Sequence, residues 1–349
     1  MPFNADQLAY AGRAAIDFYL KNDPIDQINT ERPLIKKLTA GKSPYAGGLQ
    51  YVVEQLRYSN DSNFQSYFGD SQVSYNRKRT IQQAKFTWGA FHDGFGLNED
   101  ELAQNGITMT DDKSATPTDA EKVQLTNLLS ENMETLKLGF EENFDLMLHR
   151  DGTASATDIA GLDHIISTTP AASSTIGPLN QSTYAWWRNY ADLNIAATSG
   201  VLTDAMEVAW RECTRYGGTQ PNFILCGGDF LDAYRKDASY TVNRRLEVTG
   251  RGDTAIDASV SGVYFKGVEL VWDPVFDVLD TADSPAEPWS KRCYFINDRF
   301  LKLRPIKGHW MVPRKPPRVY DRYVHYWALT SKAALTTNKR NAHAVLSIY

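Results

Sequence analysis

Two short segments contain residue types that phosphate binding or nucleophilic chemistry uses. Gly41-Lys42-Ser43 matches the end of a phosphate-binding loop, but such a loop requires a glycine at position 36, where the chain has Lys36. Cys226-Gly227-Gly228-Asp229 follows an apolar run and resembles a turn that presents a nucleophile between a strand and a helix. A catalytic cysteine needs a histidine beside it, and no spacing in the sequence brings one there. We therefore interpret Cys226 as a buried thiol at a strand-to-helix turn.

Metal ligands and paired catalytic carboxylates are not indicated either. The six histidines are scattered, and no two stand three or four residues apart, as ligands on one helix face would. Asp158 and Asp163 are better explained as turn and cap residues. The cysteines form no CxxC pair, which favours free buried thiols in a reducing compartment: they are Cys213, Cys226 and Cys293. The sequence therefore predicts no catalytic, cofactor-binding or metal-binding residue, and no enzymatic activity.

Trp186-Trp187-Arg188-Asn189 is the most unusual short segment of the chain. Adjacent indole rings beside a guanidinium group could stack on nucleic acid bases or on a ligand. Large aromatic side chains also serve as packing anchors, where they bury much apolar area. We favour a packing anchor beneath a loop.

Charge is distributed unevenly along the 349 residues, whose net charge is −5. Residues 286–349 hold 13 Lys and Arg against 3 Asp and Glu, whereas the preceding 285 residues hold 24 against 39. A basic final quarter on an acidic body suits contact with nucleic acid or packing against copies of the same chain. Since an acidic body would repel DNA elsewhere, we favour packing between copies.

The sequence shows no membrane or secretion signal. Its first residues lack the basic and apolar regions of a signal peptide. The apolar runs are far shorter than the roughly 18–20 residues that a membrane span needs. We therefore expect a chain that makes no contact with a membrane.

Residues 1–44 are predicted to form an N-terminal arm with little core of its own. One short amphipathic turn is expected around residues 10–20, and Pro24, Pro33, Gly41 and Pro44 interrupt the chain. A long segment that is interrupted this often needs another surface to lie on.

Residues 45–97 are predicted to form an extended β-ribbon. Residues 49–58 and 72–88 have the pattern of strands, and glycines at 89, 94 and 96 lead out of the ribbon. The segment from Tyr75 to Thr80 is polar on both faces. Such a ribbon buries no apolar side and is marginal by itself, so we expect it to lie across a neighbouring molecule.

Residues 118–150 are predicted to form one long helix. Thr118-Asp119-Ala120-Glu121 fits a capping box, His149 and Arg150 suit the last turn, and Gly152 follows as a stop. Apolar residues recur at spacings of three and four: Leu125, Leu128, Leu129, Leu136, Phe140, Phe144, Met147 and Leu148. At about 1.5 Å per residue, the helix would be roughly 48 Å long, which is the length of a strut.

The rest of the chain alternates shorter helices and strands. We expect helices at 200–217 and 229–237, a buried strand at 221–226 and a hairpin at 263–273. Three more strands are expected at 292–296, 300–303 and 320–329. The predicted fold class is α+β, with helices and short antiparallel strands mixed.

This order of parts, together with three stretches of sequence, resembles the major capsid proteins of tailed bacteriophages. The segment 158–166, followed by Tyr184-Ala185-Trp186-Trp187-Arg188-Asn189, is similar to a Gly-Leu-Asp … Tyr-x-Trp-Trp-Arg-Asn run of such coats. The other two stretches are Tyr294 to Pro305 and the ending around Asn338-Lys339-Arg340. The resemblance covers nearly the whole chain.

The resemblance implies a phage-capsid-type fold. Its parts would be an N-terminal arm at 1–44, an extended loop at 45–97, a peripheral domain at 98–174 and 286–349 with a spine helix at 118–150, and an axial domain at 175–285. The implied function is structural, with self-assembly into pentamers and hexamers of an icosahedral shell that encloses phage double-stranded DNA. The implied location is the virion, after assembly in the cytoplasm of the bacterial host.

The implied partners are further copies of the chain, a separate scaffolding protein, a portal protein, a decoration protein and packaged DNA held without sequence specificity. Candidate residues for contact with another subunit or with DNA are cations of the ribbon and of the basic end: Arg77, Lys78, Arg79, Arg299, Lys302, Arg304, Lys307, Arg314, Lys315 and Arg318. Some coats of this fold crosslink neighbours through a lysine and an asparagine. Lys78 or Lys85, with Asn338 or Asn341, have the required residue types.

The alternative is a nucleic-acid-binding protein that uses the basic end and its aromatic residues, which are Trp310, Tyr320, Tyr323, Tyr326 and Trp327. This alternative predicts salt-sensitive DNA binding by monomers. The capsid hypothesis predicts large, regular assemblies instead.

Overall fold

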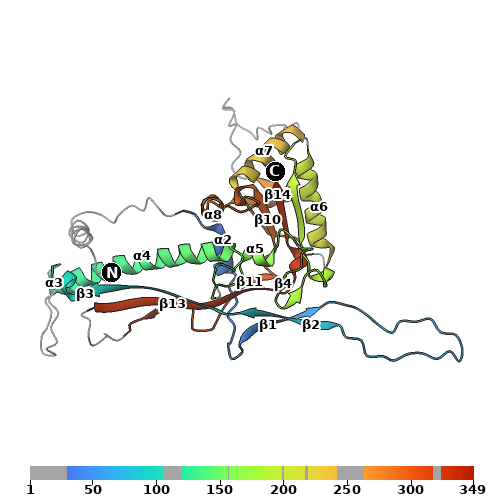
Figure 1. Cartoon of the computed structure of the whole chain (residues 1–349), viewed down its shortest axis with the longest axis horizontal. Helices are drawn as coiled ribbons and strands as arrows, with labels where there is room; N and C mark the ends of the chain where they lie inside the picture. The colour runs from blue at the N-terminus through green and yellow to red at the C-terminus, as the bar shows by residue number, and fades with distance from the viewer. Residues whose placement is uncertain are drawn as a thin grey trace, which may run out of the picture. The chain divides into compact units, whose positions relative to one another are not determined.

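The computed structural model describes residues 30–104, 119–155, 157–198, 200–216, 219–241, 263–316 and 324–349. These residues form two compact units. The first contains residues 90–144 and 306–332, and the second contains residues 31–89, 145–305 and 333–349. Two long elements, α4 (Asp119–His149) and β13 (Val324–Thr337), contribute residues to both units. Helices and strands are mixed along the chain (Figure 1), which confirms the predicted α+β class.

The long predicted helix is confirmed as α4. Its buried apolar residues recur at every fourth position and form one stripe: Leu136, Phe140, Phe144 and Leu148. In the first unit, Phe144 packs edge-on against Phe91, with ring centroids 5.1 Å apart. Thr118, the expected capping residue, lies outside the described residues. No helix of the described part of the chain combines the length and the apolar character that a membrane crossing requires.

The first unit also contains strands that pair with the first part of β13. These are β3 (Gly89–Asn98) and β12 (Val312–Arg314), and a short helix, α3 (Glu99–Gln104), follows β3. The expectation that residues 89–96 merely lead out of the ribbon is wrong, because all of them belong to β3. A Cβ at Gly94 would lie 2.8 Å from the Trp327 carbonyl oxygen, and one at Gly96 would lie 2.9 Å from Val324 Cγ1. Glycine is therefore needed where β13 approaches closely.

The core of the second unit is a six-stranded sheet with the order β6-β14-β10-β7-β9-β8. The strands are β6 (Tyr190–Ile195), β7 (Phe223–Cys226), β8 (Tyr264–Phe265), β9 (Val268–Trp272), β10 (Arg292–Ile296) and β14 (Ala344–Ile348). The predicted strands at 221–226 and 292–296 and the hairpin at 263–273 are confirmed. However, β14 runs parallel to β6, and β7 runs parallel to β9. The expectation of antiparallel strands is wrong for these two pairs, because parallel partners need a long connection between them that local patterns do not reveal.

Helices cover both faces of this sheet. On one face, α6 (Val201–Arg215) and α7 (Gly228–Thr241) share a core with Phe230 and Phe295, and Figure 1 shows both helices beside the sheet. On the other face, Tyr294 contacts Phe276 of α8 (Val275–Asp283) and Trp289 of η2 (Trp289–Lys291). Burial of each such large apolar side chain stabilises the fold by about 1.5–3 kcal/mol. The predicted helices at 200–217 and 229–237 are thus confirmed.

The ribbon is a two-stranded ladder that ends in a long loop. β1 (Tyr51–Arg57) pairs antiparallel with β2 (Ile81–Thr87), from Tyr51 opposite Thr87 to Arg57 opposite Ile81. The strand expected at 72–88 begins only at Ile81, because residues 58–80 form no ladder. The base of the ribbon buries one side: Val52, Leu56, Ala84 and Phe86 pack with Leu179, Trp187 and Ala334. The expectation of a ribbon that buries no apolar side is therefore wrong at its base.

The helix α2 (Pro33–Ala40) corrects the prediction for the N-terminal arm. Pro33 was expected to interrupt the chain, but it stands at the first position of the helix, where the missing N–H costs no hydrogen bond. Leu34, Ile35 and Leu38 are buried, so this part of the arm has a packed core. The amphipathic turn expected around residues 10–20 lies outside the described residues.

Short elements complete the second unit. They are α5 (Leu162–Ile165), β4 (Thr175–Ile176), β5 (Leu179–Asn180), η1 (Ala185–Trp187), β11 (Leu301–Pro305) and η3 (Arg340–Ala342). β11 pairs with the last part of β13, from Leu301 opposite Thr337 to Pro305 opposite Ala333. The strand expected at 300–303 is confirmed, and the one expected at 320–329 is the beginning of the longer β13.

Candidate assembly surfaces

The loop of residues 58–80 joins β1 to β2 and extends away from the other elements of its unit (Figure 1). Its two sides are tied together by hydrogen bonds: the Tyr58 hydroxyl donates to the Arg79 carbonyl at 2.8 Å, and Asn63 Nδ2 donates to the Asn76 carbonyl at 2.6 Å. Four aromatic side chains of the loop face solvent, with exposed fractions of 94% for Phe64, 93% for Phe68, 89% for Tyr75 and 70% for Tyr67. A concentration of exposed aromatic rings on one short loop marks a surface that a partner covers.

Most of the predicted contact residues lie on the surface. The exposed ones are Arg77, Lys78, Arg79, Arg299, Lys307, Arg314 and Lys315. Lys302 is half-buried, and Arg318 lies outside the described residues. Arg304 lies at the base of the ribbon instead, where Nη2 is 2.7 Å from Glu54 Oε1 in an ion pair within one chain. For the exposed cations, contact with another subunit or with DNA stays a prediction.

The basic end uses part of its positive charge inside the chain. Besides Arg304, both Arg292 and Arg340 are buried. Lys339 places its Nζ 5.0 Å from the centre of the Phe300 ring. The surface of residues 286–349 is therefore less basic than their composition indicates.

Arg340 is fully buried, and its hydrogen bonds go to neutral oxygens only. The acceptors are the carbonyls of Ile165 and Trp187, Gln181 Oε1 and Asn189 Oδ1, at 2.6, 2.8, 3.2 and 2.9 Å. Burial lowers the pKa of Arg340 to about 9, which still leaves the guanidinium charged at neutral pH. One side chain thus holds η3 to three earlier segments of the chain.

The pair Trp186-Trp187 is confirmed as a packing anchor. Trp187 is buried and donates its Nε1–H to the Ile176 carbonyl at 3.0 Å. Trp186 stacks on Tyr58 at the base of the loop, with ring centroids 5.6 Å apart. The indole rings therefore serve the fold and the position of the ribbon, and they form no open stacking platform.

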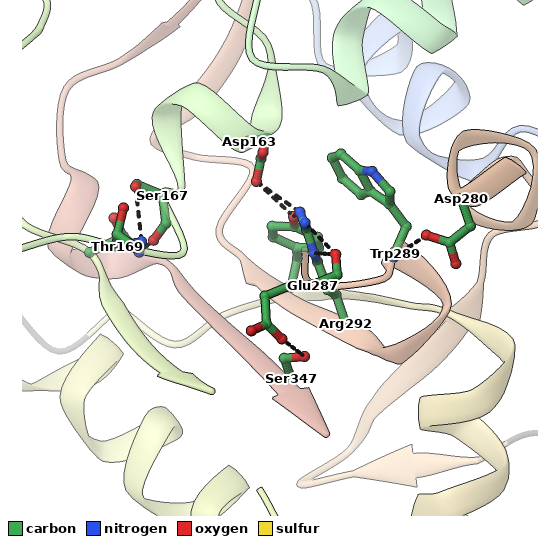
Figure 2. A network of polar contacts seen from close by, with 10 residues as sticks. Asp163, Ser167, Thr169, Asp280, Glu287, Trp289, Arg292 and Ser347 are labelled. Carbon is green, nitrogen blue, oxygen red and sulfur yellow. Dashed lines mark hydrogen bonds and ion pairs between the residues drawn. The ribbon is translucent and has the colours of Figure 1, made fainter. Parts of the chain in front are cut away.

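A second buried cation, Arg292, organises the network in Figure 2. Its Nη1 donates to Asp163 Oδ1 at 3.0 Å, while Nε and Nη2 donate to the Glu287 carbonyl at 3.0 and 2.6 Å. The guanidinium lies 4.3 Å from the centre of the Trp289 ring. The Ser347 hydroxyl donates to Glu287 Oε2 at 3.2 Å, which ties β14 to the same network. Asp163 is therefore an ion-pair partner of Arg292, which corrects its interpretation as a turn or cap residue only.

His149 is buried between two carboxylates at the end of α4. Its Nδ1 lies 2.8 Å from the Asp145 carbonyl oxygen, and its Nε2 lies 3.0 Å from Asp273 Oδ2. Each ring nitrogen thus faces an oxygen that can accept a hydrogen bond, an arrangement that favours the charged form of the ring. Burial opposes this charge, but Asp145 and Asp273 outweigh it and raise the pKa of His149. Burial also raises the pKa of Asp145 to about 6, although His149 opposes the shift.

None of these groups is arranged for nucleophilic or metal chemistry. The three cysteines are free and buried, as predicted. Burial raises the pKa of Cys213 and of Cys226 to about 12, so both thiols are protonated at neutral pH. No group of three or more potential ligands that could hold a metal occurs among the residues that the structure describes.

Two aromatic residues of the nucleic-acid alternative, Trp310 and Trp327, pack against other rings. Trp327 stacks on Phe95, with ring centroids 5.6 Å apart, and Trp310 packs edge-on against Phe144 at the same distance. Tyr320 and Tyr323 lie outside the described residues. Rings that pack against one another inside a unit cannot stack on bases, so this alternative gains no support.

Local sequence patterns do not reveal the partners of the buried cations, although they contain one signal. Arg292 begins the apolar run Arg-Cys-Tyr-Phe-Ile, and a charged residue at a buried strand implies a buried partner. His149 was expected to serve only the helix dipole, yet its partner Asp273 lies in the turn between β9 and α8. No local pattern connects residues so far apart in the chain.

A scan against protein-family models and a search of curated proteins give no match to the sequence. Among solved structures, the cyanophage A-1(L) capsid asymmetric unit is similar, with a TM-score of 0.64 and 15% identity over 94% of this chain and 95% of that chain. The capsid of the Myoviridae phage XM1 has a TM-score of 0.52 at 12% identity, over 95% and 97% of the two chains. The capsid of a native GTA particle has a TM-score of 0.51 at 10% identity, over 96% and 97%. The fold of this chain, over nearly its whole length, is that of the major capsid proteins of tailed bacteriophages.

Proposed function

We propose that the chain is a structural subunit that assembles with copies of itself into an icosahedral shell enclosing double-stranded DNA. The observation that carries this proposal is the likeness to a capsid subunit over 94% of this chain and 95% of that chain. A likeness that extended over one domain only would be compatible with many functions, because one fold hosts unrelated activities. Here the likeness extends over nearly the whole length of the chain.

The surface of the single chain supports assembly. The rings of Phe64, Phe68 and Tyr75 are almost fully exposed, and water contact with so much apolar area is unfavourable. Repetition of one subunit in a closed shell covers such surfaces, since each copy offers the same loop and the same receiving surface to its neighbours. The role that follows is structural and not enzymatic.

The domain boundaries remain proposals within this function. Residues 45–97 would form the extended loop, 98–174 and 286–349 the peripheral domain, and 175–285 the axial domain that meets its copies around five-fold and quasi-six-fold axes. Pentamers and hexamers of the chain would be the building blocks of the shell, which would form in the bacterial cytoplasm.

The other partners belong to the proposal as well. A separate scaffolding protein would guide closure, a portal protein would occupy one vertex, and a decoration protein could cover the outer face. The exposed cations Arg299, Lys307, Arg314 and Lys315 would meet acidic surfaces of the next subunit. Packaged DNA would be held through phosphates without sequence specificity.

Sedimentation of the expressed protein, followed by negative-stain electron microscopy of the heaviest fraction, tests the proposal. We expect regular shells, or rings of five or six subunits, whose yield rises when a scaffolding protein is supplied. A chain that stays monomeric at high concentration, with and without scaffolding protein, would overturn the proposal. Salt-sensitive DNA binding by that monomer would then favour the nucleic-acid alternative.

A further inference from the structure

Two of the three cysteines lie directly opposite each other in the sheet of the second unit. β7 and β10 are antiparallel neighbours, and their register places Cys226 opposite Cys293. Side chains of directly opposite residues lie on the same face of a sheet. Both thiols belong to the core between this face and the helices α6 and α7. Residues that are far apart in the chain thus place two sulfur atoms side by side.

The backbone hydrogen bonds show that the two cysteines form a close pair. The Cys226 carbonyl accepts from the Asp273 N–H at 3.1 Å, so the backbone of Cys226 faces β9 and not β10. The next residue, Gly227, faces β10 and donates to the Arg292 carbonyl at 3.0 Å. Cys226 and Cys293 are therefore a non-hydrogen-bonded pair, in which the α-carbons lie about 4.5 Å apart and the side chains approach closely.

This spacing suits a disulfide bond. A disulfide joins residues whose α-carbons lie about 4.4–6.8 Å apart and whose β-carbons lie about 3.5–4.5 Å apart. The bond therefore requires rotation of the two side chains and no movement of the strands. Both residues are free thiols in the structure, and Cys226 Sγ donates a weak hydrogen bond to the Val271 carbonyl at 3.5 Å. The third cysteine, Cys213, lies on α6 and shares the core but no strand register.

The surroundings keep the pair aligned and protect it from rapid oxidation. Both β7 and β10 are interior strands of the sheet, with partners on both sides. Cys226 and Cys293 are fully buried, and burial raises the pKa of Cys226 to about 12. The thiolate is the form that reacts with oxidants, so a brief exposure leaves the pair reduced. A sustained exposure gives the rare thiolate time to react.

We infer that Cys226 and Cys293 are a redox-responsive pair, which closes to a disulfide when the folded chain meets hydrogen peroxide for long enough. One sulfur, as a thiolate, attacks a peroxide oxygen, the O–O bond breaks, and a sulfenic acid and a hydroxide ion form. The second sulfur attacks the oxidised sulfur, and the hydroxyl group leaves as water. The hydroxide takes the proton that the first thiol released, so two thiols and one peroxide become one disulfide and two water molecules.

The disulfide would tie the two ends of a long segment together. Residues 226–293 include α7, β9 and α8, and closure of so long a loop removes much entropy from the unfolded chain. The inference goes beyond the proposed function and applies to a single subunit as well as to a shell. For the proposed shell, which forms in a reducing cytoplasm, the bond would follow release from the host.

Peptide mapping tests the inference on the full chain. The protein is reduced with dithiothreitol, freed of it, treated with hydrogen peroxide at neutral pH, and then unfolded in urea with iodoacetamide, which blocks the remaining thiols. Mass spectrometry of the unreduced peptides should show Cys226 linked to Cys293 and Cys213 alkylated. Dithiothreitol should remove the link.

The chain unfolded in urea before the peroxide step is the reference, and the peroxide dose is one that links its cysteines. If that dose left Cys226 and Cys293 of the folded chain alkylated, or oxidised them without joining them, the inference would be overturned. Soluble subunits and shells can both be mapped. A chain that forms no shells would therefore overturn the proposed function without deciding the fate of the cysteine pair.

Thermal unfolding provides a second readout. Peroxide treatment is expected to raise the unfolding midpoint of the wild type by about 5–10 °C, because the unfolded chain loses entropy. Cys213→Ala is the matched control, since it removes a buried cysteine of the same core and should keep the rise. Cys226→Ala should show no rise, and it also accounts for oxidation of methionines. Equal rises in Cys226→Ala and the wild type would contradict the inference.

Discussion

Arg340 holds four segments of the second unit together without a carboxylate partner. Removal of its guanidinium would leave four buried oxygens without their donor, and each unpaired buried acceptor is costly. The residue therefore acts as a fixed link between η3 and the loops around Trp187. Its charge matters less than its ability to donate in several directions from one plane.

Arg340→Met is expected to lower the free energy of unfolding by about 3–5 kcal/mol, because the apolar chain fills part of the space but donates no hydrogen bond. Urea unfolding of the soluble subunit, below the concentration at which particles form, measures the effect. Arg299→Met serves as the control, since Arg299 is exposed and surface changes stay within about 0.5 kcal/mol. Similar losses in the two variants would contradict the role given to Arg340.

The carboxylate of Asp145 makes stability depend on pH. Burial raises its pKa from 3.8 to about 6, although the charges of His149 and Arg32 and the backbone N–H of Ile35 oppose the shift. An acid whose folded pKa lies above its unfolded pKa binds its proton more tightly in the folded state. Stability is therefore highest below about pH 4 for this group and falls as the pH rises toward 6, by about 3 kcal/mol in total.

Asp145→Asn should flatten this dependence, because an amide resembles the protonated acid and does not titrate. Urea unfolding between pH 4.5 and 7.5 compares the slopes for the wild type and the variant. We expect the wild type to lose stability over this range and the variant to lose much less. Asp61→Asn, at an exposed position, is the control and should show the same change of stability with pH as the wild type. If Asp145→Asn also showed the wild-type change, Asp145 would not be its source.

At the scale of elements, two glycines of the first unit have opposite roles. A Cβ at Gly94 of β3 would meet the Trp327 carbonyl at 2.8 Å and Ala328 Cβ at 3.1 Å. A Cβ at Gly139 of α4 would meet nothing nearer than Asp93 Oδ2 at 3.9 Å. Gly94 is therefore required by the close approach of two strands, whereas Gly139 only weakens a helix.

Gly94→Ala is expected to destabilise the subunit by about 1–3 kcal/mol through overpacking. Gly139→Ala should stabilise it by up to about 1 kcal/mol, because alanine restricts the unfolded chain and favours the helix. Thermal unfolding of both variants beside the wild type measures the two effects. If the unfolding temperatures of the two variants shifted in the same direction, the close approach of β3 to β13 would not be the reason for glycine at position 94.

The sequence predicts those elements that local rules determine. α4 was expected within one residue at each end, because an apolar stripe and its flanking residues are all local. α2 was missed because Pro33 can either interrupt a chain or begin a helix, and only the burial of Leu34 and Leu38 decides between the two. β3 was missed because the reason for its glycines lies on β13.

The candidate surfaces differ in the same way: local patterns predict some of their features, whereas contacts between distant residues determine the others. The ribbon was located from its pattern, and its polar residues Arg77, Lys78 and Arg79 are exposed as expected. By contrast, Arg304 was counted as a contact residue because its partner Glu54 lies in a distant strand.

At the scale of the whole molecule, folding and assembly should be separable. The ladder of the ribbon closes with Arg57 opposite Ile81, so a two-residue Asn-Gly turn can replace residues 58–80 without disturbing the strands. We expect the shortened subunit to fold with an unfolding midpoint close to that of the wild type. It should form no shells, because it lacks the rings and cations that meet a neighbour.

Sedimentation and electron microscopy of the shortened subunit measure the outcome. A second variant that keeps the loop but replaces Ser74 and Gln83 by alanine, both outside the aromatic and basic set, controls for changes to the ribbon as such. Shells from the shortened subunit in wild-type yield would show that the loop is dispensable for assembly.

The place of β14 between β6 and β10 has a consequence for synthesis. β6 spans residues 190–195, and the neighbour that completes its pairing spans residues 344–348. Translation adds about 5–20 residues per second, so β14 is synthesised on the order of 10–30 seconds after β6. During this interval an unfinished sheet edge is open to wrong partners. The rate of synthesis, and the chaperones that guard a nascent chain, should therefore limit the yield of competent subunits before any shell begins to form.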